Sequence, residues 1–94
     1  MRELPESLSR LTGLHTLQID NNPITYLPPW IGSLARLREL RASDIPRLTE
    51  VPEKIGLLTK LTKLDLKRTR CTRDRIPESV ARLPNLEHIY TSLS

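Results

Sequence analysis

The chain has 94 residues and a net charge of +4, with 37% hydrophobic and 28% charged residues. This length suits a single domain, and no apolar stretch is long enough to span a bilayer. The one cysteine, Cys71, excludes an internal disulfide framework. No Asn-x-Ser/Thr glycosylation site occurs, and we expect an intracellular, reducing setting.

A hydrophobic residue followed by proline opens each of four similar units. The openings are Leu4-Pro5, Leu27-Pro28, Val51-Pro52 and Ile76-Pro77, which lie 23, 24 and 25 residues apart. The units therefore cover about residues 4–26, 27–50, 51–75 and 76–94 of a single domain, 1–94. Repeats of this length with a Leu-x-x-Leu-x-Leu core are typical of a leucine-rich-repeat solenoid.

The first half of each unit carries apolar residues three positions apart, as Leu8, Leu11 and Leu14 do in the first unit. This spacing predicts a short helix or 3₁₀ turn with one buried stripe. The later stripes are Ile31, Leu34 and Leu37; Ile55, Leu58 and Leu61; and Val80, Leu83 and Leu86. The proline at each opening fits the start of such a turn.

The second half of each unit has apolar residues two positions apart, as in Leu17 and Ile19, and this is strand spacing. The later pairs are Leu40 and Ala42, Leu64 and Leu66, and Ile89 and Thr91. We therefore predict an α/β solenoid of about four repeats. Short parallel strands form its concave face, and short helices or 3₁₀ turns form its convex face. One unit cannot bury its apolar edge alone, so stability depends on stacking.

The units depart from the consensus in two places. Asn22 fills the slot where the repeat favours Asn, but Ile45 and Thr69 fill it in the next two units, so a ladder of Asn side chains is interrupted after one rung. The segment 72–75 lengthens the third unit, and we expect it to form a polar bulge.

The concave face is the first candidate binding surface. Its outward residues are expected to be Thr16, Gln18, Asp20, Glu39, Arg41, Ser43, Lys63, Asp65, Lys67, His88, Tyr90 and Ser92. They are polar, mixed in charge and more basic toward the third unit. They form either a solvated sheet face or a surface that binds peptides or proteins, as solenoid concavities commonly do.

The aromatic residues give a second candidate surface. The chain has one Trp, two Tyr and no Phe, and all three aromatics occupy slots that are polar in other units. Exposed Trp and Tyr are enriched at binding hot spots. Tyr26 and Trp30 flank Leu27-Pro28-Pro29 and could form one patch on the convex rim. Alternatively, Trp30 folds over the proline pair as local packing.

A run from Lys60 to Arg75 is strongly basic. It contains Lys60, Lys63, Lys67, Arg68, Arg70, Arg73 and Arg75, against only Asp65 and Asp74. Nucleic acid or an anionic membrane surface could bind such a run. However, no stacking aromatics interleave with it, and a solvated basic face or a site for an acidic protein explains it better.

Catalytic chemistry has little support in the sequence. Cys71 shares an apolar slot with Ile24, which predicts a buried, inert thiol. His15 and His88 occupy non-equivalent positions, and no metal or phosphate-binding motif occurs, so we expect no cofactor and no metal. The three glycines, one in each of the first three repeats, are expected to serve turns.

The two ends look unfinished. Leu4, Leu8 and Leu11 are expected to face outward at the start, and Val80, Leu83, Leu86, Ile89 and Leu93 at the end. The N-terminus, MRELPESL, already follows the repeat pattern, so we expect that it is not a signal peptide. Either the chain is a fragment that lacks its caps, or it covers its open strand edges by forming a homo-oligomer.

The pattern LPxxIxxLxxLxxLxL runs through nearly the whole chain, and the stretch LRELRASDIPRLTEVPEKIG carries its most specific part. It resembles the leucine-rich-repeat domains of type III effectors from plant-pathogenic bacteria, especially the Xanthomonas XopL-like group. The resemblance implies binding of host proteins and, in the parent protein, a separate E3 ubiquitin ligase domain. In other ligase effectors a catalytic Cys-x-Asp follows the repeats; Cys71-Thr72-Arg73-Asp74 is one residue longer and lies within a repeat, so it does not match. Intracellular eukaryotic repeats of the Scribble and Ras-binding type are similar as well.

We therefore predict a non-catalytic protein-recognition module from a bacterial effector, delivered into the host cell. The alternatives are the substrate-recognition part of an E3 ligase, a self-associating structural repeat, and weak binding of nucleic acid or anionic lipid. The predicted partner-binding residues are Gln18, Glu39, Arg41, Lys63, Asp65, Lys67, His88, Tyr90, Tyr26 and Trp30.

Overall fold

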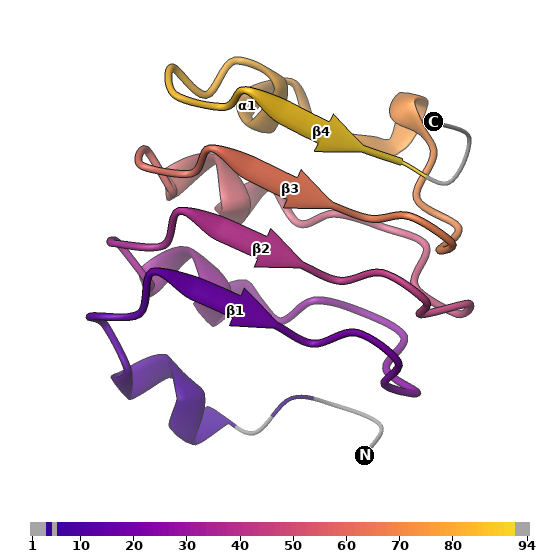
Figure 1. Ribbon diagram of the computed structural model, residues 1–94, viewed down its shortest axis with the longest axis horizontal. Helices are drawn as coiled ribbons and strands as arrows, with labels where there is room; N and C mark the ends of the chain where they lie inside the picture. Colours follow the sequence, from indigo (N-terminus) through magenta and orange to yellow (C-terminus); the bar gives the residue numbers. More distant parts are fainter. Residues whose placement is uncertain (1–3, 5, 92–94) are drawn as a thin grey trace.

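A computed structural model describes residues 4 and 6–91, and these form four coils stacked in one direction (Figure 1). Each coil contributes one three-residue strand to a single parallel sheet, in the order β1-β2-β3-β4. The strands are β1 (Thr16–Gln18), β2 (Glu39–Arg41), β3 (Lys63–Asp65) and β4 (His88–Tyr90). The predicted leucine-rich-repeat fold is confirmed.

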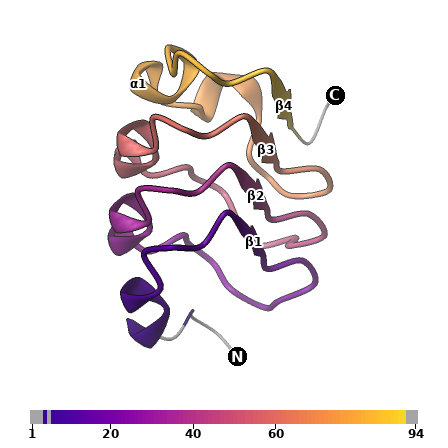
Figure 2. The same cartoon turned by 60° about the vertical axis from the view of Figure 1, so that its left-hand side comes forward.

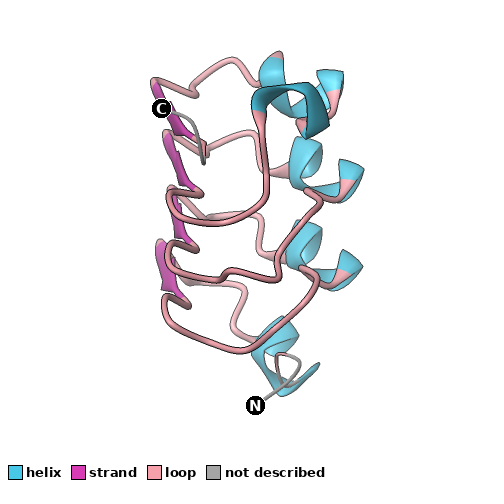
Figure 3. Ribbon diagram, turned by 90° about the vertical axis from the view of Figure 1, so that its right-hand side faces the viewer, coloured by secondary structure: helices cyan, strands magenta, loops and turns pink. Residues whose placement is uncertain are grey.

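Helical turns cover the side opposite the sheet, where Figures 2 and 3 show them stacked above one another. Four are 3₁₀ turns, namely η1 (Glu6–Arg10), η2 (Pro29–Ser33), η3 (Glu53–Leu57) and η4 (Arg73–Arg75); the fifth, α1 (Glu78–Ala81), is a single α-helical turn. A proline precedes η2, η3 and α1 with φ of −69°, −68° and −60°. Such φ values are pre-set by the proline ring, which explains why each unit starts there.

None of the helices among residues 4 and 6–91 has the length and apolar character needed to cross a membrane. The predicted bulge at residues 72–75 is the extra turn η4, and Arg73, Asp74 and Arg75 are all exposed there. The third unit, which contains η4, is one residue longer than the second.

The coils stack in strict register. Leu17, Leu40, Leu64 and Ile89 face one another across the sheet. The ladder continues beyond the strands, because the N–H of Ile19 donates to Arg41 at 2.8 Å and the N–H of Ala42 donates to Asp65 at 2.8 Å. Equivalent residues of successive coils therefore form rows, both inside and outside the sheet.

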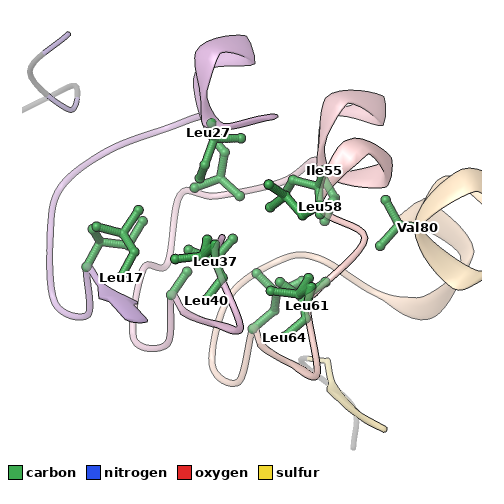
Figure 4. Close-up of a cluster of buried hydrophobic side chains, with 14 of the residues drawn as sticks. Leu17, Leu27, Leu37, Leu40, Ile55, Leu58, Leu61, Leu64 and Val80 are labelled. Atoms are coloured by element: carbon green, nitrogen blue, oxygen red, sulfur yellow. The ribbon is translucent and has the colours of Figure 1, made fainter. Parts of the chain in front are cut away.

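The core lies between the strands and the helical turns (Figure 4). Its middle layers are fully buried: Leu37, Leu40, Ile55, Leu58, Leu61 and Leu64. Burying a side chain of this size stabilises a fold by roughly 1.5–3 kcal/mol. The apolar residues of the helical turns and of the strands belong to one continuous core cluster.

The ends are better covered than the sequence suggested. Leu4, Val80 and Leu83 were expected to face outward, and that expectation is wrong, because all three are buried in the core. A terminal coil still has one neighbour, and the turn α1 packs against η3. Leu8, Leu86 and Ile89 are half-buried, and Leu11 is 47% exposed. Leu93 lies outside the described residues.

A left-handed residue follows the strand segment of each of the first three coils. Asn21, Asp44 and Arg68 have φ of 60°, 58° and 57°. Asn and Asp tolerate this conformation well, whereas Arg does so less readily. The guanidinium of Arg68 binds the carboxylate of Asp44 through two hydrogen bonds, the longer being Nη2 to Oδ2 at 2.9 Å. This contact between coils favours the unusual backbone of Arg68.

The interrupted Asn ladder is also confirmed. The side-chain amide of Asn22 donates to the carbonyl of Ile19 at 2.6 Å, whereas Ile45 is buried in the apolar core. Thr69 takes over the polar role, since its hydroxyl donates to Leu66 at 2.7 Å and accepts from the N–H of Cys71 at 3.1 Å. A shorter side chain thus holds the same bend.

Two of the three glycines permit close approach of neighbouring helical turns. No glycine has a positive φ, so the expected role in turn conformation is not what requires them. A Cβ on Gly32 would lie 2.6 Å from the carbonyl oxygen of Lys54, and one on Gly56 would lie 2.7 Å from the Ser79 hydroxyl. A Cβ on Gly13 would meet nothing within 4 Å.

We therefore expect Gly32→Ala to destabilise the protein by about 1–3 kcal/mol, because the backbone of the next coil must move away from the added methyl group. Gly13→Ala is the matched control, and it should be neutral or stabilising by roughly 0.4–1 kcal/mol. Urea unfolding followed by circular dichroism measures both. Equal effects of the two substitutions would contradict the close-packing explanation.

Candidate binding surface

The outward strand residues form three rows across the concave face. The first row is Thr16, Glu39, Lys63 and His88, and the second is Gln18, Arg41, Asp65 and Tyr90. Asp20, Ser43 and Lys67 form the third row just beyond the strands, and Ser92 lies outside the described residues. The structure thus brings eight of the ten predicted binding residues together on one surface.

Charge is divided unevenly over this surface. The half on β1 and β2 carries Asp20 and Glu39, with Arg41 beside them. The half on β3 and β4 carries Lys63 and Lys67. The predicted increase in basic character along the chain therefore becomes a gradient across the sheet, from one end of the stack toward the other.

Asp20 links the first two coils on the acidic half. Its Oδ1 accepts from the N–H of Ser43 at 2.8 Å and from the Ser43 hydroxyl at 3.0 Å, and its Oδ2 accepts from the amide of Gln18 at 2.9 Å. Burial alone would raise the pKa of Asp20, but these hydrogen bonds, with a smaller contribution from the charge of Arg41, lower the pKa below its usual value. Asp20 is therefore a fixed anion at neutral pH.

Two residues expected to be solvated on this face are buried instead. Asp65 is 5% exposed and Ser43 is 7% exposed. Asp65 sits at the centre of the array, with Arg41 and Tyr90 beside it on the neighbouring strands and Lys63 and Lys67 before and after it. Its Oδ1 accepts from the N–H of Lys67 at 3.1 Å. Longer neighbouring side chains surround the short carboxylate of Asp65, which is therefore buried beneath the surface that they form.

Tyr90 organises the basic half. The ammonium of Lys67 lies 4.9 Å from the centre of its ring, and that of Lys63 lies 5.8 Å away. Both distances fall within the range of cation–π attraction. The ring of His88 lies parallel to Tyr90 with centroids 6.2 Å apart. The aromatic side chain thus gathers two lysines from the adjacent strand region.

The two convex aromatics do not share one environment. Trp30 is half-buried and packs against the core, and its carbonyl accepts a 2.6 Å hydrogen bond from the Ser33 hydroxyl. Tyr26 is 45% exposed. Trp30 therefore offers only part of its ring to a partner, while Tyr26 remains accessible.

The basic run does not gather on one surface. Lys63 and Lys67 lie on the concave face, and Arg68 is occupied by Asp44. Lys60 is exposed in the loop before β3, whereas the remaining members, Arg70, Arg73 and Arg75, are exposed in and just before η4. A polyanion would have to wrap around the third coil to contact them all.

Groups suited to catalysis are not assembled in the described part of the chain. Burial raises the pKa of the Cys71 thiol, so it stays protonated at neutral pH, and its sulfur lies 3.7 Å from the carbonyl of Leu48. Residues 4 and 6–91 contain no group of three side chains able to hold a metal ion. One open hollow among the described residues is lined by Arg38, Lys60, Thr62, Asn85 and Glu87.

Residues 1–93 match the family model described as a leucine-rich repeat region. The chain belongs to the leucine-rich-repeat family. Domains of this family serve as protein-binding modules, and their repeats present extended surfaces for that purpose.

Two solved structures are similar to this leucine-rich-repeat domain. The leucine-rich-repeat domain of the type III effector XCV3220 (XopL) is 37% identical, with a TM-score of 0.83; the match covers 97% of this chain and 33% of that one. The Leptospira interrogans leucine-rich-repeat protein LIC12759 is 25% identical, with a TM-score of 0.73, covering 97% and 28%. The predicted resemblance to a XopL-type repeat domain is confirmed.

A further relative is a much longer protein than this chain. Vasorin of Mus musculus is 35% identical over 68 residues, which is 70% of this chain and 10% of vasorin. The chain therefore spans a third or less of each of these proteins. What they share with it is the repeat architecture.

The hydrogen bonds of Asp20 lead to a pH prediction. A carboxyl whose pKa is lowered by folding contributes stability above its unfolded pKa, and this contribution is lost as the pH falls through the folded value. We expect Asp20→Asn to reduce the free energy of unfolding at pH 7 by about 1–2 kcal/mol, since charged hydrogen bonds are replaced by neutral ones. The difference from the unsubstituted protein should shrink below about pH 4.

Urea unfolding at several pH values between 7 and 3 measures this difference. Asp44 and Asp74 also have a lowered pKa, so both proteins should lose stability in acid, and only the gap between them reports on Asp20. A gap that stays constant down to pH 3 would contradict the assignment.

Proposed function

We propose that this domain recognises a protein partner through its concave face. The single observation that supports the proposal best is the ordered array of Arg41, Lys63, Lys67 and Tyr90 around the buried Asp65. Such an array is held by neighbouring strands of a rigid sheet, so little conformational entropy is lost when it binds. Tyr and Arg are also the residue types enriched at interface hot spots.

We further propose that the domain comes from a bacterial type III effector and acts on host proteins. The similarity to the XopL repeat domain supports this origin. Delivery into the host cell would place the protein in a reducing compartment, which agrees with its single, buried cysteine.

Reversal of two charges on the concave face tests the proposal. Arg41→Glu combined with Lys63→Glu should abolish capture of a host partner, because like charges then face the partner at the centre of the surface. The measurement is affinity capture from host-cell extract followed by direct binding to the identified protein. Far-UV circular dichroism must show that the variant stays folded.

Lys54→Glu combined with Arg73→Glu is the matched control, because it makes the same change in net charge on exposed residues of η3 and η4. This control should bind as the unsubstituted protein does. Light scattering over a concentration series tests the alternative of self-association, for which the exposed Leu11 and the outer edges of β1 and β4 are the candidate contacts. A dimer that dissociates on dilution, or capture unaffected by the Arg41 and Lys63 changes, would contradict the concave-face proposal.

A second candidate is that the domain selects substrates for an E3 ubiquitin ligase within a longer protein. The likeness to a XopL-type repeat domain favours it. We expect a longer protein that carries this chain to assemble ubiquitin chains in a reconstituted assay, and residues 1–94 alone to assemble none. Ubiquitin transfer that needs only residues 1–94 would contradict the assignment of substrate selection to this domain and of catalysis to another part of the longer protein.

A further inference from the structure

The basic half of the concave face has an arrangement that points to one class of partner. Lys63 and Lys67 lie two residues on either side of Asp65, yet neither ammonium forms an ion pair with a carboxylate among the residues that the structure describes. Their defined contacts are instead with the face of Tyr90. Both positive charges thus lie near the Tyr90 ring, and Asp44 attracts Lys67 only at longer range, without a direct ion pair.

The carboxylate beneath them is already occupied. Asp65 is buried, and one of its oxygens accepts from the backbone N–H of Lys67. Its negative charge offsets part of the repulsion between the lysines, which lets them stay close together. Arg41 lies on the far side of Asp65, so the cluster keeps an excess of positive charge.

The ring of Tyr90 adds an apolar floor. It is half-buried, with both lysine ammonium groups and the parallel ring of His88 near it. A ligand group that docks here meets cations on the side of β3 and an aromatic face on the side of β4. This combination suits a carboxylate on a short aliphatic stem, because the stem can lie on the ring while the oxygens reach the ammonium groups.

We propose that β3 and β4 form a subsite for an extended acidic segment of the partner protein, with its Glu or Asp side chains bound by Lys63 and Lys67 over Tyr90. The inference rests on the proposed function and names the chemistry of the partner at that surface. Carboxylates are favoured over nucleic acid because the remaining basic residues of the run point elsewhere, so a phosphate backbone would find few further contacts. Charge complementarity places the segment over Lys63 and Lys67 and toward β4, because Asp20 and Glu39, the cross-strand partner of Lys63, repel an acidic group on the side of β1 and β2.

Acetylated hexaglutamate is the probe, titrated into the ¹⁵N-labelled protein at low ionic strength. We expect chemical-shift changes to concentrate on residues 63–67 and 88–90, and binding to weaken as salt is added. Lys63→Gln combined with Lys67→Gln should reduce the affinity about tenfold, since two charge-assisted contacts are lost. Tyr90→Leu should also weaken binding, whereas Tyr90→Phe should retain it.

Lys54→Gln combined with Arg73→Gln removes the same charge elsewhere and should change the affinity by less than about twofold. Shift changes spread over the whole surface, or equal losses in the two double variants, would overturn the proposal. Tighter binding of a phosphoserine peptide of equal charge, or of a single-stranded oligonucleotide, would overturn the assignment to carboxylates. If hexaglutamate fails while the concave-face reversal still abolishes partner capture, this inference fails and the proposed function stands.

Discussion

Every feature of this domain depends on the in-register stacking of coils. A coil of about 24 residues cannot bury its own leucines, so each one is stable only when its neighbour covers them. The parallel ladder allows one register in which Leu17, Leu40, Leu64 and Ile89 meet. Since side chains alternate along a strand, that register also fixes the outward rows. Core packing and the binding surface are therefore set by the same constraint.

The sequence predicted most of the fold because the two spacings of its apolar residues follow from the geometry of helical turns and of strands. Each stripe of apolar residues three apart begins inside a helical turn and continues beyond it, and each apolar pair two apart begins inside a strand and ends just after it. The burial of Val80 and Leu83 was missed because the ends were treated as fully open, although one neighbour suffices to cover the inner stripe of a terminal turn. The left-handed residues were missed because Asn21 and Asp44 are typical of this conformation, whereas Arg68 is not.

The sequence predicted which residues belong to the candidate surface, but it did not predict how deeply each side chain is buried. Alternation identifies which side chains point outward, but it says nothing of how neighbours of different length cover one another. Asp65 was read as an exposed contact, yet the longer side chains on all four sides bury it. Lys63 and Lys67 contact Tyr90 from a neighbouring coil, about one repeat away in the sequence. No local sequence motif therefore reveals these contacts.

The position of Asp65 shows why a mixed-charge face can still be selective. If its carboxylate were exposed, it would pair with the lysines and cancel the charge offered to a partner. Because burial and the N–H of Lys67 hold it beneath the surface, it relieves repulsion without blocking access. Asp20 follows β1, and Glu39 lies on β2 beside Lys63, so both repel an acidic group that approaches from that side of the sheet. An acidic partner is thereby directed to one end of the solenoid, and the order of the repeats determines its orientation.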